Sequence, residues 1–282
     1  LVRSRGLGDV YKRQVGYYDG KMYCLDRATG QLAWSFATGG PITHTAAIAD
    51  GKVFFGSHDG HVYAVDAASG QLAWKYRTNA GIQNAPCISG SSLYIGSSDG
   101  NMYALDIVTG AERWIFRTGV PIYTSAACTP SAVYFGNESV QAFALRAQDG
   151  ALLWKKQLRG QSMAGYWPVV AEQSSVTYFR TQPMGGFHPV LGSGDDLLSA
   201  LPDGKTPENV TLEQNAIRNY LNGSGNRWKT FWALDLATGD EKYTAPVLYT
   251  SGEGAIPVPP VVDDANGRGW VVWRTKYSTF FS

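Results

Sequence analysis

Short stretches in which apolar and polar residues alternate recur along the chain, and turns that contain glycine separate them. In the segment 81–118 this pattern predicts four strands, which run Ile82–Ile88, Ser92–Gly96, Asn101–Asp106 and Ala111–Arg117. The turns contain Gly90, Gly100 and Gly110, since glycine accepts a positive φ that a Cβ would oppose. Four short strands joined by tight turns predict one antiparallel sheet.

The same unit returns at an interval of 40 residues, as from Gly70 to Gly110. Three columns define it: an aspartate (Asp26, Asp66, Asp106, Asp235), a glycine (Gly30, Gly70, Gly110, Gly150, Gly239) and a tryptophan (Trp34, Trp74, Trp114, Trp154). A period near 40 with strand signals predicts the blades of a β-propeller rather than a helical solenoid. The predicted fold class is therefore all-β, a propeller of four-stranded antiparallel blades that is incomplete at both ends.

The repeated residues are predicted to have structural roles. The aspartate accepts backbone N–H groups across its own turn, and the glycine closes that turn in a left-handed conformation. The tryptophan provides a large flat surface for packing against the adjacent blade. A catalytic site occurs once in a protein, whereas these residues recur in every unit, so we assign none of them to catalysis.

The regularity divides the chain into a partial blade, four complete blades and a second partial blade. Their predicted ranges are 15–36, then 41–76, 81–118, 121–156 and 165–243, and finally 255–282. In the unit 121–156, Asn137-Glu138-Ser139-Val140 replaces the Asp-Gly turn and Arg146 replaces the aspartate. An insertion over 180–227 interrupts the next unit; we expect it to be irregular at first and helical over Thr211–Leu221.

The first residues, 1–14, share nothing with the repeat. The run Asp9 to Gln14 resembles the translation of a transposase-based sequencing adapter, so we interpret 1–14 as a non-native leader left by sequence assembly. A natural basic extension is the alternative. On the first interpretation, any natural signal peptide or lipid anchor lies outside the sequence.

Composition and charge exclude some classes of function. The chain has 282 residues, 33 of them glycine, and its formal net charge is +1 without a long basic run, which argues against a nucleic-acid partner. No apolar run is long enough to predict a membrane span. The cysteines Cys24, Cys87 and Cys128 match neither zinc spacing nor a disulfide framework, so we expect small buried strand residues. His58, His61 and His188 are not at metal-ligand spacing, and no metal site is predicted.

The string that runs from Gly56-Ser57 through Asp59-Gly60, Tyr63-Ala64, Asp66 and Ser69-Gly70 to Trp74 resembles the pyrroloquinoline-quinone (PQQ)-like propeller repeat. That family includes quinoprotein dehydrogenases, which hold PQQ and calcium near the ring axis. It also includes cofactor-free propellers, such as the outer-membrane-assembly lipoprotein of the BamB type. The resemblance implies a bacterial protein of the periplasm or the extracellular space.

The dehydrogenase interpretation requires features that this sequence lacks. Quinoprotein alcohol dehydrogenases typically carry two adjacent cysteines over the cofactor, and this sequence has no such pair. The family's calcium shell of Glu, Asn and Asp has only weak candidates, Asn137 with Glu138 and Asp195 with Asp196. We therefore expect no cofactor, and keep a fragment of a PQQ- and calcium-dependent dehydrogenase as the alternative. A sensor or scaffold part of a larger chain is a third possibility.

In a propeller of this type, partners and ligands meet the funnel mouth, at the loops that lead into the first strand of each blade. The side chains at these positions vary between units while the framework does not; they are Thr43, His44, Gln83, Asn84, Tyr123, Thr124, Tyr166 and Trp167. Converging polar and aromatic side chains predict a site for a protein or a small ligand. Ordinary loop residues bonded to backbone remain the alternative.

Overall fold

The computed structural model describes residues 12–182, 215, 218–223, 229–245, 261–266 and 268–270. Within these residues, successive antiparallel sheets follow the order of the chain. Blade 1 consists of β1 (Lys12–Gly16), β2 (Lys21–Asp26) and β3 (Leu32–Ala37). Blade 2 consists of β4 (Ala47–Ala49), β5 (Lys52–Gly56), β6 (His61–Asp66) and β7 (Leu72–Arg77).

The next three sheets repeat the arrangement of blade 2. Blade 3 consists of β8 (Cys87–Ser89), β9 (Ser92–Gly96), β10 (Asn101–Asp106) and β11 (Glu112–Arg117). Blade 4 consists of β12 (Ala127–Cys128), β13 (Ala132–Gly136), β14 (Gln141–Arg146) and β15 (Leu152–Gln157). Blade 5 consists of β16 (Val169–Ala171), β17 (Val176–Arg180), β18 (Phe231–Asp235) and β19 (Glu241–Tyr243), and a hairpin of β20 (Val261–Asp263) and β21 (Arg268–Trp270) follows.

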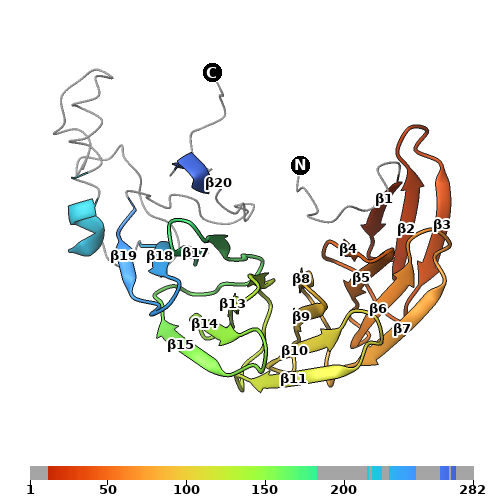
Figure 1. Ribbon diagram of the computed structural model, residues 1–282, viewed down its shortest axis with the longest axis horizontal. Helices are drawn as coiled ribbons and strands as arrows, with labels where there is room; N and C mark the ends of the chain where they lie inside the picture. The colour runs from red at the N-terminus through yellow and green to blue at the C-terminus, as the bar shows by residue number, and fades with distance from the viewer. Residues whose placement is uncertain are drawn as a thin grey trace.

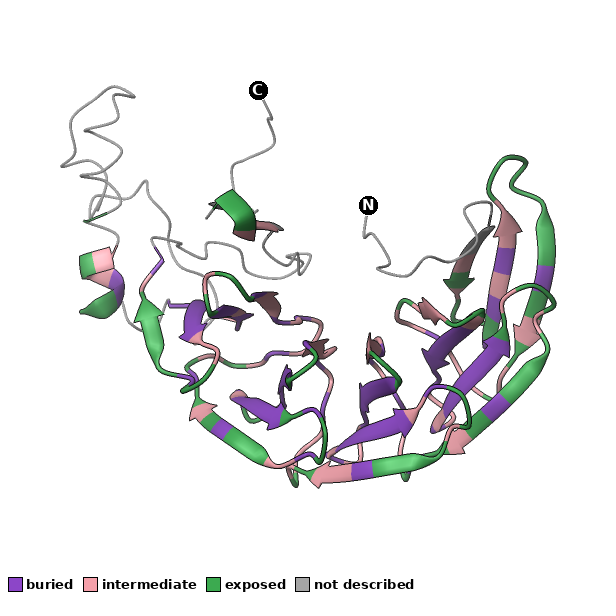
Figure 2. Ribbon diagram, viewed as in Figure 1, coloured by how far each residue is buried: buried purple, intermediate pink, exposed green. Residues whose placement is uncertain are grey.

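The blades lie side by side in an arc (Figure 1). The first strands β4, β8, β12, β16 and β20 are neighbours in that order and line the inside of the arc, while β7, β11 and β15 form its outer rim. The middle strands are buried, and the outer strands are exposed except for one buried band (Figure 2). The predicted fold class, a propeller of four-stranded antiparallel blades, is confirmed.

The buried band on each outer strand is the repeated tryptophan, which packs on the glycine of the next blade. Trp34, Trp74, Trp114 and Trp154 are each 6–9% exposed. A Cβ on Gly110 would lie 2.6 Å from Cδ2 of Trp74, and the same contact joins the other tryptophans to Gly70, Gly150 and Gly239. Each indole N–H also donates to a carbonyl of the neighbouring turn, as from Trp74 to Ile107 at 3.1 Å. The glycine column therefore leaves room for the indole of the preceding blade.

The aspartate of each D-x-x-[TS]-G turn accepts bonds within the turn. In blade 3, Oδ1 of Asp106 accepts from the N–H of Val108 and Thr109, at 2.9 Å each. Blade 4 keeps the backbone turn without this aspartate, because Gly150 N still donates to the carbonyl of Arg146 at 2.9 Å. The turn thus tolerates the substitution at Arg146.

A second aspartate, in the Asp-Gly turn between the middle strands, joins neighbouring blades. Oδ2 of Asp99 accepts from the hydroxyl of Tyr103 at 2.6 Å and from the backbone N–H of Asn79, in the preceding connection, at 3.0 Å. Asp59 makes the same pair of contacts with Tyr63 and Gly39. In blade 4, Ser139 and Phe143 replace both members of this pair.

The predicted strand Ile82–Ile88 is wrong at its start, since β8 covers only Cys87–Ser89. Residues 82–86 form a connection whose backbone donors bond outside a sheet. Ile82 N donates to the carbonyl of Ser57 at 3.0 Å, and Ala85 N donates to Oγ of Ser125 at 2.8 Å. Pro86 has no N–H to contribute to a ladder. The apolar side chain of Ile82 packs against Gly56 of the preceding blade rather than against a strand partner.

The expectation that the cysteines form no disulfide is also wrong. Cys87 on β8 and Cys128 on β12 form a disulfide between the first strands of blades 3 and 4. The two residues are 41 positions apart, so the bond joins neighbouring repeats. Cys24 is buried, as expected, and takes no part in the disulfide.

Residues at both ends and in the insertion add to this framework. Lys12–Gln14, part of the predicted leader, lie in β1 and pair with β2. Residues 218–222 are helical; the rest of the predicted helix and most of the insertion lie outside the described residues. The carboxylate of Asp264, beyond β20, accepts from the backbone of Gln173 and Ser174, which ties the final hairpin to blade 5.

Candidate functional site

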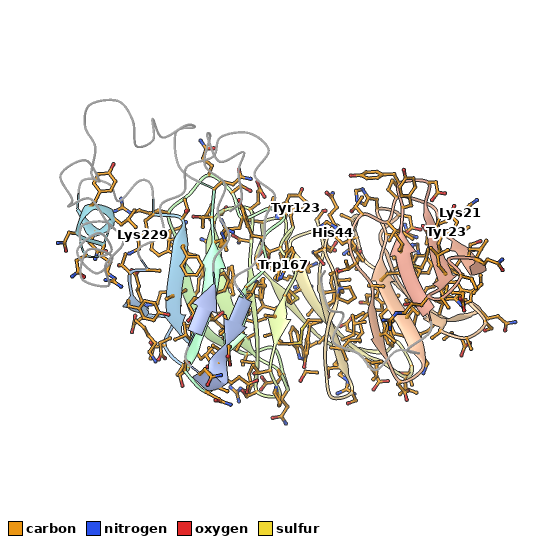
Figure 3. All side chains as sticks on the ribbon, turned by 90° about the horizontal axis from the view of Figure 1, so that it is seen from above. Lys21, Tyr23, His44, Tyr123, Trp167 and Lys229 are labelled. Atoms are coloured by element: carbon orange, nitrogen blue, oxygen red, sulfur yellow. A yellow bond between two sulfur atoms is a disulfide. The ribbon has the colours of Figure 1, made fainter. Side chains whose placement is uncertain are left out.

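Six of the eight predicted funnel-mouth residues lie on the connections that lead into β4, β8 and β12, and Tyr166 and Trp167 precede β16. We call 41–46, 81–86 and 121–126 the mouth connections. Each lies against the turn between the second and third strands of the blade that it enters. His58 N donates to the carbonyl of Pro41 at 2.9 Å, and Glu138 N donates to that of Pro121 at 2.9 Å. Figure 3 shows His44, Tyr123 and Trp167 in the middle of the molecule, with Tyr23 and Lys229 toward opposite ends.

In blades 2, 3 and 4 this packing places two variable positions near each other, which we call a mouth pair. In blade 2 the pair is Thr43 and His58, joined by a hydrogen bond of 3.0 Å between Oγ1 and Nε2. In blade 3, Nε2 of Gln83 donates to Oγ of Ser98 over 3.5 Å. In blades 2 and 3 the pair joins a mouth connection to its blade through side chains that differ between the two repeats.

The mouth pair of blade 2 includes a second histidine. Oγ1 of Thr43 is also 3.0 Å from Nδ1 of His44, so one hydroxyl bridges two imidazole rings. Burial and the nearby His58 both lower the pKa of His44, which favours its neutral form. A threonine hydroxyl donates one proton, so it donates to one ring and accepts from the other.

In the connections of blades 3 and 4, the second predicted residue donates hydrogen bonds to the backbone of the blades. Asn84 is 2% exposed, and its Nδ2 donates to the carbonyls of Gly96 at 3.1 Å and Ile122 at 3.0 Å. Thr124 is 1% exposed, and its Oγ1 donates to the carbonyl of Gly136 at 2.6 Å. The Nδ2 of Asn84 and the hydroxyl of Thr124 thus bond to backbone carbonyls, as the alternative of ordinary loop residues predicts.

The pair in blade 4, Tyr123 and Glu138, differs from the other two. No hydrogen bond joins the two side chains among the contacts of the described residues, and Oε2 of Glu138 is buried without a partner. Oδ1 of Asn84 is likewise buried without a partner. Two oxygen acceptors are thus left unsatisfied at the mouth of blades 3 and 4, where a buried acceptor without a donor is costly.

Glu138 belongs to a turn whose backbone is unusual. Val140 occupies the position of Gly60 and Gly100 and keeps their left-handed conformation, with φ of 58°. A β-branched residue is strained in that region, and such strain is frequent near functional sites. The turn of blade 4 therefore has the same backbone conformation as the turns of blades 2 and 3, although its residues differ.

Blade 5 does not extend the series of mouth pairs. Met163 occupies the place of Ile82 and Ile122, since it packs against Gly136 as they pack against Gly56 and Gly96. Tyr166 is 5% exposed, with the guanidinium of Arg180 5.5 Å from its ring centre. Trp167 is partly exposed beside it. The structure places this aromatic pair beyond the position equivalent to Tyr123.

Sequence reasoning missed the partners of the mouth positions, which are His58, Ser98 and Glu138. They stand 15 residues after Thr43, Gln83 and Tyr123, and each immediately precedes the aspartate position of the Asp-Gly turn. The variation in this column, His to Ser to Glu within an otherwise constant turn, is the signal that could have identified them.

Two features of a quinoprotein site, a cluster of metal ligands and a pair of adjacent cysteines, can be compared with the described residues. Among the described residues, no group of three or more His, Cys, Asp or Glu side chains could hold a metal ion. The disulfide joins Cys87 and Cys128 on separate blades, whereas the quinoprotein resemblance calls for two adjacent cysteines. The described residues thus provide neither a vicinal disulfide nor a cluster of three such metal ligands.

The family is established by a match to a family model described as outer membrane protein assembly factor BamB, over residues 18–245. The chain belongs to this BamB-type family of PQQ-like propellers. The match covers blade 1 from its first turn to the end of blade 5. No curated protein sequence matches the chain at a significant level.

Solved structures share the fold at low sequence identity. The crystal structure of BamB from Moraxella catarrhalis matches with a TM-score of 0.54 and 21% identity, over 61% of this chain and 56% of that one. The computationally designed Ika8 protein matches with a TM-score of 0.55 and 20% identity, over 61% and 52%. A europium-containing methanol dehydrogenase has a TM-score of 0.49 and 17% identity, over 53% and 40%. The alignment therefore spans little more than half of the BamB chain.

Proposed function

We propose that this chain is a non-catalytic binding or scaffold module of the cell envelope, which recognises a protein partner at the funnel mouth. The observation that carries the proposal is the mouth pair: a constant framework holds Thr43, Gln83 and Tyr123 against three different partners. A rigid scaffold that presents variable side chains on its connections is the usual design of a recognition surface.

The family supports the same proposal. Its description names an assembly factor for outer membrane proteins, a role performed through contacts with other proteins. A small ligand is the second candidate for the mouth, since polar and aromatic side chains converge there. A protein partner agrees better with a family named for assembly.

The disulfide between Cys87 and Cys128 supports a location outside the cytoplasm, in the periplasm or the extracellular space. Structural disulfides persist in oxidising compartments and are rare where thiols are kept reduced. Among the described residues, no helix has the length and apolar character needed to cross a membrane.

The alternative, a fragment of a PQQ- and calcium-dependent dehydrogenase, is tested by adding both to the full-length protein. We expect no tight binding of PQQ, measured by equilibrium dialysis, and no alcohol-dependent dye reduction. Stoichiometric PQQ binding that requires calcium would overturn the proposed function.

A further inference from the structure

The blade-4 mouth pair contains an acidic side chain that the described fold does not use. Glu138 is only partly exposed, and its Oε2 is buried without a hydrogen-bond donor. No ion pair within the described ranges includes it; their salt bridges involve other carboxylates. A buried carboxylate oxygen without a partner destabilises the protein by itself, and a donor supplied from outside would remove this cost.

A second unsatisfied acceptor, on the preceding repeat, supports this interpretation independently. Asn84 is 2% exposed, and its Nδ2 lies between the carbonyl oxygens of Gly96 and Ile122. Carbonyl oxygens only accept, so the amide cannot be reversed, and Oδ1 is the atom left without a partner. Ile122 immediately precedes Tyr123, which places this amide beside the connection that carries the blade-4 pair.

Three chemical groups thus lie on or against the mouth connection 121–126: the Tyr123 ring is on it, Glu138 is on the turn that bonds to it, and Asn84 bonds to it from the preceding connection. Backbone contacts hold the arrangement, since Glu138 N donates to Pro121 and Asn84 donates to Ile122. A carboxylate and an amide oxygen accept hydrogen bonds, and an aromatic face attracts a cation. The complementary ligand is a cationic N–H donor.

From this arrangement we infer that Tyr123, Glu138 and Asn84 form a subsite for a protonated alkylamine or guanidinium, presented by a lysine or arginine side chain of the partner. The inference rests on the proposed function and names the class of partner residue. The pairs in blades 2 and 3 satisfy one another, so the cationic group is directed to the mouth of blades 3 and 4.

The test uses the whole chain and measures binding of n-butylammonium, of a lysine-containing pentapeptide and of neutral n-pentanol by NMR titration. We expect both cations to bind saturably and pentanol not to bind, with affinities on the order of millimolar for one anchoring group. Glu138→Gln should weaken binding at least about tenfold, because it removes a charge-assisted contact. Glu172→Gln, at an exposed glutamate before β17, is the matched control and should leave binding unchanged.

A stability measurement keeps the test independent of binding. Glu138→Ser, which installs the residue of the blade-3 position, should raise the melting temperature because it removes an unsatisfied buried oxygen. A lower melting temperature would show that Glu138 already has a partner within the chain, and would overturn the inference.

The remaining outcomes are equally decisive. Tighter binding of the peptide than of butylammonium identifies a protein source for the cation, and equal binding identifies a free amine. No saturable binding, binding unaffected by Glu138→Gln, or displacement of butylammonium by calcium chloride alone would overturn the subsite. A partner that still crosslinks to the mouth in the Glu138→Gln variant would leave the proposed function standing without this subsite.

Discussion

The indole of Trp74 lies directly on Gly110 of the next blade, so close that a Cβ there would meet Cδ2 at 2.6 Å. The same indole donates to the carbonyl of Ile107, in the turn that Gly110 closes. One residue from each repeat thus connects the outer strand of a blade to the turn of its neighbour. This contact joins the blades at the outer rim, while the mouth connections join them near the axis.

Replacing Trp74 with alanine should destabilise the chain by about 3–5 kcal/mol, because a buried aromatic side chain is lost and a cavity remains between blades 2 and 3. Denaturant unfolding followed by circular dichroism measures the loss. An unfolding free energy equal to that of the unmodified chain would contradict the packing role of Trp74.

Gly110→Ala and Gly30→Ala separate the two reasons for glycine at this position of the repeat, which are a positive φ and the space that the indole needs. Both residues have positive φ, 73° and 71°, but a Cβ on Gly30 would meet nothing within 4 Å. Gly30→Ala should therefore cost about 1 kcal/mol through backbone conformation alone. Gly110→Ala should cost about 1–3 kcal/mol more, because its methyl group overlaps Trp74. Equal losses in urea unfolding would show that the indole contact does not constrain this position.

The Cys87–Cys128 disulfide should stabilise the chain by about 2–4 kcal/mol, because it closes a long loop in the unfolded state. The double variant Cys87→Ser/Cys128→Ser should melt at a lower temperature than the oxidised chain, and a reductant should affect only the chain with both cysteines. Thiol titration of the unfolded, unreduced protein should detect one reactive thiol, that of Cys24, which is outside the disulfide. Three free thiols would contradict the bond.

Stability should fall as the pH rises from about 10 to 12, through tyrosines whose pKa is raised in the folded state. Burial, and then the hydrogen bond to Asp99, raise the pKa of Tyr103 to about 12 from 10.0. In this range the folded chain keeps a proton that the unfolded chain loses, so the contribution is complete below pH 10 and is lost as the pH rises through 12.

Tyr103→Phe removes this titration, and the fold accepts phenylalanine at the equivalent position, Phe143. The pH dependence of its unfolding free energy should be shallower than that of the unmodified chain, by up to about 1.4 kcal/mol per pH unit. Parallel pH profiles for the two proteins would show that the proton on Tyr103 makes no difference to folding.

The sequence predicts the blades well because each repeat has the same local sequence features. Strands, glycine turns and the Asp106 turn are each determined by residues that are close in sequence. The strands β9 and β10 accordingly have the bounds that the pattern predicts. The connection before β8 is also predicted as a strand, yet Ile82 packs against Gly56 of the preceding blade. The local sequence does not distinguish a strand from a segment whose partners lie on two different blades.

The features of the candidate site depend on contacts between repeats, which a column of equivalent residues does not express. Cys87 and Cys128 are one position out of register with the repeat, so no column contains both. The proposed subsite combines Glu138 with Tyr123, 15 residues away, and with Asn84 in the preceding repeat. Such contacts follow from how the blades are placed next to one another, which the structure supplies.

The central claim, recognition of a protein at the funnel mouth, is tested most directly by photocrosslinking of the full-length protein in the cells that make it. A photoreactive amino acid replaces Tyr123 at the mouth or, as the control, the exposed Lys75 on the outer strand β7. The account predicts a discrete crosslinked protein from position 123 and none from position 75. No adduct at position 123, or the same adducts from both positions, would contradict it.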